Sequence, residues 1–216
     1  MNKDENDKKV EEKKKKEGGC CGGGSSKKKK KSKPKLLSLL TIGNQKVGKT
    51  AILNQFIDGQ FVPTLQTTGK EFRVVERTIK IENEDVTQKV KIWDSSGQER
   101  FRSIVISSAK NTNGIFLVYD VTNQETFNDL QGWIQSIEEE AKDLSTFPFI
   151  IMANKIDLEE ERVISHEQGK AFAASKKMPY FETSAKTGQG LKEALDYLIT
   201  AAAKSVMGIP YDNIII

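Results

Sequence analysis

The segment from Gly43 to Thr50 constrains the fold of this chain more than any other. It reads Gly-Asn-Gln-Lys-Val-Gly-Lys-Thr and matches the pattern G-x-x-x-x-G-K-[ST]. An apolar run at 36–42 precedes it and predicts a buried strand, and a helical segment at 50–57 follows it. A strand, a glycine-rich turn and a helix N-terminus in this order gather backbone N–H groups around a small concavity with positive potential. The pattern therefore predicts a site for the β-phosphate of a nucleotide.

Two side chains of this loop have specific expected roles. Lys49 would bring its ammonium to the β- and γ-phosphates as a binding and catalytic group, and Thr50 would give its hydroxyl to Mg²⁺. The residues predicted to hold the phosphates are Gly43, Asn44, Gln45, Lys46, Val47, Gly48, Lys49, Thr50 and Ala51.

Charge is distributed unevenly along the 216 residues. Residues 1–35 carry 14 lysines and 6 acidic residues, a net charge of +8, whereas residues 36–216 carry 20 basic and 24 acidic residues, a net charge of −4. A globally basic nucleic-acid-binding domain is therefore not indicated, and no nucleic-acid partner is expected. We expect a disordered lysine-rich tail at 1–35, one domain at 36–207 and a short C-terminal tail at 208–216.

The N-terminal tail holds both cysteines of the chain, Cys20 and Cys21. Two adjacent cysteines exclude a disulfide scaffold, and no stretch reaches the eighteen or so apolar residues of a membrane span. An acyl chain on either cysteine, beside the run from Lys27 to Lys31, would give the two signals that stable attachment to a membrane surface needs. A nuclear-localisation or nucleic-acid patch is one alternative, and an unmodified solvated linker is another.

After the first helix the chain becomes irregular between residues 58 and 70, where glycine, proline and threonine predict a functional loop. Its aromatic residue, Phe61, would either stack on a nucleotide base or pack onto the core. Alternating apolar and polar residues at 71–81 and 87–93, separated by Asn-Glu-Asp at 83–85, then predict an antiparallel hairpin with a tight turn.

The second strand of this hairpin leads into Asp94-Ser-Ser-Gly-Gln98. A carboxylate at a strand end after a phosphate-binding loop can support Mg²⁺, so Asp94 is a metal candidate. Gly97 would let the backbone approach a γ-phosphate, because any side chain there would obstruct it. Gln98 has both a donor and an acceptor, so it could hold an attacking water in line with that phosphate.

Strands and helices alternate through the rest of the chain. The segments predicted are a helix at 99–110, a strand at 114–120, a helix at 126–144, a strand at 147–153, a helix at 165–176, a strand at 179–182 and a helix at 190–206. In the helix at 126–144 we expect Trp133 to face the core. The order predicts an α/β fold, a doubly wound six-stranded sheet that is mostly parallel with one antiparallel edge strand and helices on both faces. Every motif falls at the carboxyl end of a strand, where such sheets bind ligands.

The motif Asn154-Lys-Ile-Asp157 predicts which base is bound. The Asp157 carboxylate can accept two hydrogen bonds side by side, from N1–H and the 2-amino group of guanine, whereas adenine offers no such pair. The backbone N–H of Ala185 can donate to guanine O6, and the alkyl stem of Lys155 can lie over the base plane. The motif therefore predicts a guanine nucleotide.

With these motifs in place, the chain from Leu36 to Met207 resembles the Ras superfamily of small GTPases, and within it the Rab family most closely. Beyond the phosphate-binding loop, the resemblance rests on Thr67-Thr-Gly-Lys-Glu-Phe72, Lys91-Ile-Trp-Asp-Ser-Ser-Gly-Gln-Glu-Arg-Phe101, Leu117-Val-Tyr-Asp-Val-Thr122, Asn154-Lys-Ile-Asp157 and Glu182-Thr-Ser-Ala-Lys186.

The resemblance implies a P-loop NTPase that hydrolyses GTP to GDP and recruits effector proteins in its GTP form, in vesicle traffic. Thr67 would bind Mg²⁺ and, with the segment 94–102, would be ordered by the γ-phosphate. Ser184 and Lys186 would join the residues around guanine. An exchange factor and a GTPase-activating protein are implied partners. We expect a monomer in the cytoplasm or on the cytosolic face of endomembranes.

Some positions depart from the family pattern. Gln45 and Lys46 replace residues that are usually small, and Gln45 could crowd the γ-phosphate and the attacking water. Slow hydrolysis is therefore expected, and the alternative is a GTP/GDP-binding module with negligible turnover. The loop at 61–72 is one residue shorter than the Rab pattern, so the metal-binding threonine is Thr67 or Thr68. Thr67 keeps Thr-x-Gly in register.

Other departures concern partners and membrane attachment. Ser107-Ser-Ala-Lys110 stands where Rab proteins usually have a tyrosine pair, and Lys70 replaces an apolar residue of the effector face. The sequence ends Asn213-Ile-Ile-Ile216, without the cysteines that carry prenyl groups in the family. We therefore expect membrane attachment to have moved to the cysteine pair and lysine run of the N-terminal tail.

Overall fold

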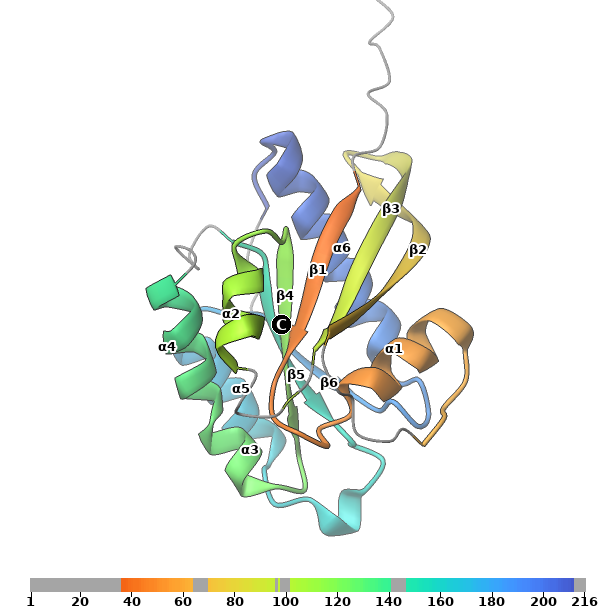
Figure 1. Cartoon of the computed structure of the whole chain (residues 1–216). Coiled ribbons are helices and arrows are strands. Elements are labelled where there is room, and N and C mark those ends of the chain that lie inside the picture. The colour runs from red at the N-terminus through yellow and green to blue at the C-terminus, as the bar shows by residue number, and fades with distance from the viewer. Residues whose placement is uncertain (1–35, 64–69, 96, 98–101, 141–146, 212–216) are drawn as a thin grey trace, which may run out of the picture. The chain divides into compact units, whose positions relative to one another are not determined.

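The computed structural model describes residues 36–63, 70–95, 97, 102–140 and 147–211. Six strands form one sheet in the order β2-β3-β1-β4-β5-β6 (Figure 1). They are β1 (Leu37–Ile42), β2 (Lys70–Ile81), β3 (Glu84–Ser95), β4 (Gly114–Asp120), β5 (Phe149–Asn154) and β6 (Tyr180–Thr183). The edge strand β2 pairs antiparallel with β3, and every other neighbouring pair is parallel. The predicted sheet is thereby confirmed.

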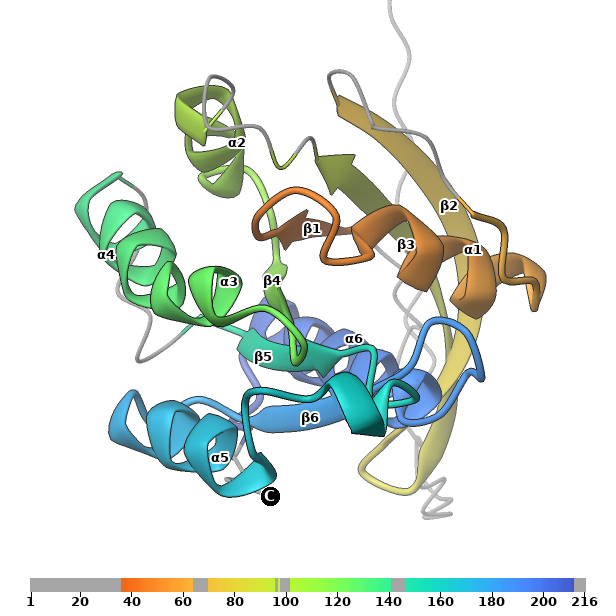
Figure 2. The same ribbon diagram turned by 90° about the horizontal axis from the view of Figure 1, so that it is seen from below.

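Helices cover both faces of the sheet, as predicted (Figure 2). The helices are α1 (Lys49–Asp58), α2 (Arg102–Ala109), α3 (Gln124–Asn128), α4 (Leu130–Glu140), the 3₁₀ turn η2 (Glu159–Glu161), α5 (His166–Ser175) and α6 (Leu191–Met207). One face carries α1 and α6, and the other carries α2, α3, α4 and α5. In the part of the chain that the structure describes, none of the helices combines the length and apolar character that crossing a membrane requires.

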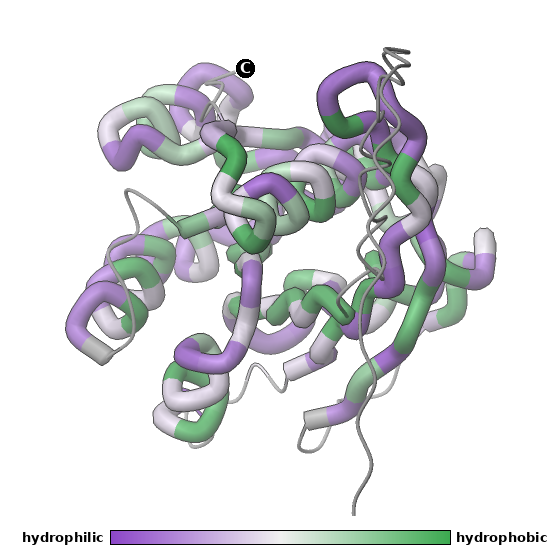
Figure 3. The backbone as a smooth tube through the Cα atoms, turned by 90° about the horizontal axis from the view of Figure 1, so that it is seen from above, coloured by the Kyte–Doolittle hydropathy of each residue, from purple (hydrophilic) through white to green (hydrophobic). Residues whose placement is uncertain are grey.

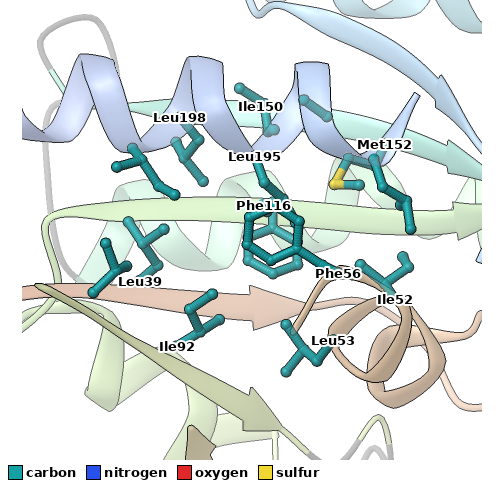
Figure 4. Packing of buried hydrophobic residues seen from close by; sticks show 14 of the residues in the cluster. Leu39, Ile52, Leu53, Phe56, Ile92, Phe116, Ile150, Met152, Leu195 and Leu198 are labelled. Carbon is teal, nitrogen blue, oxygen red and sulfur yellow. The ribbon is translucent and has the colours of Figure 1, made fainter. Parts of the chain in front are cut away.

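The core consists of two apolar layers, one on each face of the sheet. All seven residues of β4 are buried, as a central strand covered by helices on both sides requires. Phe116 of β4 lies among side chains of α1 and α6, including Phe56 and Leu195 (Figure 4). Hydrophobic and hydrophilic residues alternate around the turns of the helices, as expected when one side of each helix is buried (Figure 3). Trp133 of α4 is buried in the second layer, as predicted.

The parallel strands bring the sequence motifs to one edge of the sheet. Because β3, β1, β4, β5 and β6 all run in the same direction, their carboxyl ends meet there. The phosphate-binding loop follows β1, Asp94 lies near the end of β3, and Asp120, Asn154 and Thr183 end β4, β5 and β6. The sheet thus gathers groups that are up to about 140 residues apart along the chain.

Several element boundaries differ from the sequence prediction by one to three residues, and two of the differences have a clear local reason. The predicted helix at 126–144 begins earlier, because the side chain of Asn123 accepts hydrogen bonds from the backbone N–H groups of Glu125 and Thr126 and so caps α3. The helix is then interrupted at Asp129 before α4 begins. The hairpin turn is Glu82-Asn83, with φ values of 48° and 69°, and not residues 83–85.

The apolar layer between the sheet and helices α1 and α6 can be tested by its contribution to stability. Leu195 is fully buried, so Leu195→Ala should lower the free energy of unfolding by about 2–5 kcal/mol through lost apolar contact and a cavity. Ile104 of α2 is 57% exposed, and Ile104→Ala should change that free energy by no more than about 0.5 kcal/mol. Urea unfolding of both variants and the parent in one buffer measures the difference. Equal losses for the two variants would contradict the burial of Leu195 in the core.

Candidate functional site

The turn between β1 and α1 has a backbone that requires glycine at two positions. Gly43 has φ 135° and Gly48 has φ 99°, both in the region that favours glycine. A Cβ at Gly43 would collide with the carbonyl oxygen of Val118, and one at Gly48 would collide with the Asn154 amide. Lys46, with φ 62°, takes a left-handed conformation without being glycine. The predicted phosphate-binding residues therefore form one tight loop against the ends of β4 and β5.

Lys49 lies within this loop. Its side chain is buried, and Nζ donates to the carbonyl oxygens of Gly43 at 2.9 Å and Asn44 at 2.7 Å. Burial lowers the pKa of Lys49 to about 8, and the nearby Asp94 carboxylate partly opposes that shift. Phosphate oxygens would be stronger acceptors for this ammonium than two neutral carbonyls, because they carry negative charge.

Thr50 and Asp94 provide oxygen atoms beside Lys49. The Thr50 hydroxyl donates to Asp94 Oδ2 at 2.6 Å, whereas Asp94 Oδ1 is buried and has no hydrogen-bond partner among the described residues. Burial raises the pKa of Asp94, against the hydrogen bond from Thr50 and the charge of Lys49. A hydroxyl and a buried carboxylate with an unpartnered oxygen fit Mg²⁺, which takes oxygen ligands and is held by one or two carboxylates plus phosphates.

Gly97 brings the segment after β3 against the phosphate-binding loop. A Cβ at Gly97 would collide with the backbone carbonyl of Asn44 and with Lys49 Nζ. A side chain is therefore excluded at the place where the sequence predicts a close approach of backbone to a γ-phosphate. Gln98, Thr67 and Thr68 lie outside the described residues, so the water-holding role of Gln98 and the choice of metal-binding threonine stay predictions.

Asn154 joins the phosphate side of the site to the base side. Its Nδ2 donates to the carbonyl oxygen of Val47 at 2.8 Å, and its Oδ1 accepts from the backbone N–H of Ala185 at 3.1 Å. The side chain is 1% exposed. The sequence placed Asn154 among the nucleotide-binding residues. Its side chain ties together the two loops that would hold the nucleotide.

Asp157, the residue predicted to recognise the base, lies near Ser184 and Lys186, which are also predicted to surround the base. Its Oδ1 accepts from the Ser184 hydroxyl at 2.6 Å, and its Oδ2 lies 3.9 Å from Lys186 Nζ. Lys155 has φ 71°, and its ammonium forms an ion pair with Asp120 at the end of β4. This pair holds the stem of the lysine in place.

Asp120 was not among the predicted site residues. The sequence signal that could have identified it is its position as the last residue of a buried strand.

Phe61 is 43% exposed, so it lies at the surface and does not pack fully onto the core. Whether it stacks on a base stays a prediction.

Comparisons with known proteins agree with this geometry. The family model described as the Ras family matches residues 38–204. The chain is 37% identical to Ras-related protein Rab-8B of Dictyostelium discoideum over 82% of this chain and 85% of that protein. It is 39% identical to GTP-binding protein YPT1 of Saccharomyces cerevisiae over 74% and 75%, and 37% identical to Ras-related protein RABD2a of Arabidopsis thaliana over 82% and 85%.

The lowered pKa of Lys49 gives a pH test. Between about pH 8 and pH 10.5 the unfolded chain still holds the Lys49 proton, whereas the folded, nucleotide-free protein has released it. The free energy of unfolding should therefore rise with pH across this window, because the unfolded state binds more protons there. Urea unfolding of the parent and Lys49→Met at several pH values isolates this contribution as their difference. A difference that stays constant from pH 7 to pH 10 would contradict the burial of Lys49.

Proposed function

Because the chain belongs to the Ras family of small GTPases, we propose that it is a switch that hydrolyses GTP to GDP and recruits effector proteins in its GTP form. The observation that carries the proposal is the Asn154 amide, which bonds to the phosphate-binding loop at Val47 and to the base-side loop at Ala185. One ligand with phosphates at one end and a base at the other would contact both loops, as a nucleotide does.

On the phosphate side, catalysis would consist mainly of positioning and charge stabilisation. The reacting phosphoryl group spreads negative charge over its oxygens, so the buried ammonium of Lys49 lowers the energy of the transition state. Thr50 and Asp94, with Thr67 or Thr68, would hold Mg²⁺, which when bound neutralises charge on the β- and γ-phosphates. Gln98 would orient the attacking water.

On the base side, Asp157 would select guanine. Its carboxylate can accept from N1–H and the 2-amino group together, and adenine would leave it unpaired in a partly buried place. In the structure Oδ1 accepts from the Ser184 hydroxyl, and the ammonium of Lys186 near Oδ2 supports the negative charge. The backbone N–H of Ala185, which is predicted to donate to guanine O6, donates to Asn154 Oδ1 in the structure.

The phosphate-binding loop also bears on the rate of turnover. Gln45 is partly buried, and Lys46 is exposed and holds a left-handed backbone. Two large residues here favour slow hydrolysis, and a GTP/GDP-binding module with negligible turnover is the second candidate. In either case an exchange factor and a GTPase-activating protein would set how long the GTP form persists.

Single-turnover hydrolysis of bound GTP distinguishes the two candidates. In the parent we expect slow but measurable conversion to GDP, of the order of 10⁻⁴ s⁻¹ as for an unassisted small GTPase. Gln45→Gly should leave that rate within about threefold if Gln45 does not crowd the γ-phosphate. A parent without detectable hydrolysis, restored by Gln45→Gly, would establish the second candidate. ATP offered under the same conditions should not be retained, and its retention would contradict guanine selection.

We also propose that the protein acts on the surface of endomembranes in vesicle traffic, attached through its N-terminal tail. Relatives named as Rab proteins support the process. The tail supports the attachment, since Cys20 and Cys21 can take an acyl chain beside the lysines at 27–31. One acyl chain alone binds a membrane weakly and reversibly, so the lysines are needed as a second signal.

Cell fractionation tests this attachment. Changing both Cys20→Ser and Cys21→Ser should move most of the protein from the membrane pellet to the supernatant, because the acyl chain is lost. Ser25→Ala with Ser26→Ala, in the same glycine-rich run, is the matched control and should leave the distribution unchanged. A cysteine-free protein that stays as membrane-bound as the parent would refute acylation as the anchor.

A further inference from the structure

The side chain of Asn44 in the phosphate-binding loop bonds to the α3–α4 region, far away in sequence. Its Nδ2 donates to Asp129 Oδ2 at 2.5 Å, and its Oδ1 accepts from Trp133 Nε1 at 2.8 Å. These contacts span 85 and 89 residues of sequence. Both ends of the amide are therefore fixed by the residue between α3 and α4 and by the first turn of α4, on the face of the sheet opposite α1.

The backbone of the same residue lies at the centre of the phosphate side. The Asn44 carbonyl accepts from Lys49 Nζ at 2.7 Å, and Gly97 lies so close that a Cβ there would collide with that carbonyl. A shift of the Asn44 peptide would therefore move an acceptor of the catalytic lysine and the surface against which Gly97 lies. The side-chain bonds to Asp129 and Trp133 restrict such a shift.

Trp133 is itself held from both sides. It is 3% exposed, and the guanidinium carbon of Arg102 lies 4.3 Å from the centre of its ring. A cation over an indole face is attracted by the ring quadrupole. Arg102 begins α2, directly after the segment in which Gln98 is expected to act. The Trp133 ring thus lies between the phosphate-binding loop and the start of α2.

We infer that Asp129 and Trp133 are positioning residues, which act through the Asn44 side chain to hold the phosphate-binding loop in the shape that retains the nucleotide. This inference rests on the proposed guanine-nucleotide function. The opposing explanation is that the same bonds only secure the end of α3 and the start of α4, in which case the nucleotide is not affected.

The inference can be tested by swapping the side chains of Asn44 and Asp129 and measuring how fast the protein releases bound nucleotide. The assay follows release of a fluorescent ribose-labelled GDP after addition of excess unlabelled GDP in the presence of Mg²⁺. Asn44→Asp removes the amide donor and leaves two carboxylates facing each other at positions 44 and 129. The hydrogen bond is lost, so release of labelled GDP should become about tenfold faster or more. Adding Asp129→Asn restores one donor and one acceptor with the direction reversed, and the net charge equals that of the parent. The carboxylate at position 44 still accepts from Trp133, so the double variant should release within about threefold of the parent.

Two further variants sharpen the result. Asn128→Asp makes the same chemical change one residue from Asp129, at an exposed side chain that accepts from Gln124, and should leave release unchanged. Trp133→Phe keeps the aromatic ring but removes the N–H donor, and should speed release severalfold. The double variant also separates positioning from the charge placed at position 44, since that charge remains in it.

The outcomes are distinct. Fast release by Asn44→Asp with recovery in the double variant supports the inference. Unchanged release by Asn44→Asp, or a double variant as fast as that single variant, overturns it while leaving the proposed function intact if the parent binds labelled GDP. A parent that does not bind labelled GDP overturns the proposed function and the inference with it.

Discussion

Two of the hydrogen bonds of the Asn154 amide are the interaction on which the site depends. One reaches the phosphate-binding loop after β1, the other the loop after β6, and the amide itself ends β5. Strand order makes this possible, because parallel neighbours bring these loops to the same edge of the sheet. Gly48 leaves room for the amide, since any side chain there would collide with it. The separation between the phosphate side and the base side is therefore fixed by buried backbone and one side chain.

The phosphate side holds charges at a cost that a ligand would relieve. Lys49 and Asp94 are both buried, and burial moves their pKa values in opposite directions, each toward the neutral form. Without phosphates the lysine has two carbonyl acceptors, and one oxygen of Asp94 has no hydrogen-bond partner among the described residues. A triphosphate with Mg²⁺ supplies the charges that both groups need. Burying these two charged groups lowers the stability of the nucleotide-free protein, but it places them where a ligand can bind. Such a cost is common where polar groups are held ready for a ligand.

Most of the fold could be predicted from the sequence, because its signals are local. Apolar runs such as 114–120 identify central strands, and the spacing of Gly43, Gly48 and Lys49 requires a strand before it and a helix after it. The contacts of Asn44 with Asp129 and Trp133 could not be predicted, since they depend on how two helical turns pack against a loop almost 90 residues away. The ion pair of Lys155 with Asp120 also depends on tertiary structure, because it forms where β4 and β5 lie side by side. Local pattern identified the residue types of the site, and tertiary packing determines their partners.

The position of Trp133 has a consequence for spectroscopy. Indole fluorescence depends on the hydrogen bond of the ring N–H and on charges near the ring. Here the N–H is bonded to the phosphate-binding loop and the ring face is covered by the guanidinium of a neighbouring helix. The protein therefore carries an internal optical probe between its loop and α2. The other tryptophan, Trp93, lies on β3 with its N–H bonded to Ser38 of β1, so replacing it with phenylalanine would leave Trp133 as the only tryptophan. Rearrangements of the loop could then be followed in real time on the unlabelled chain.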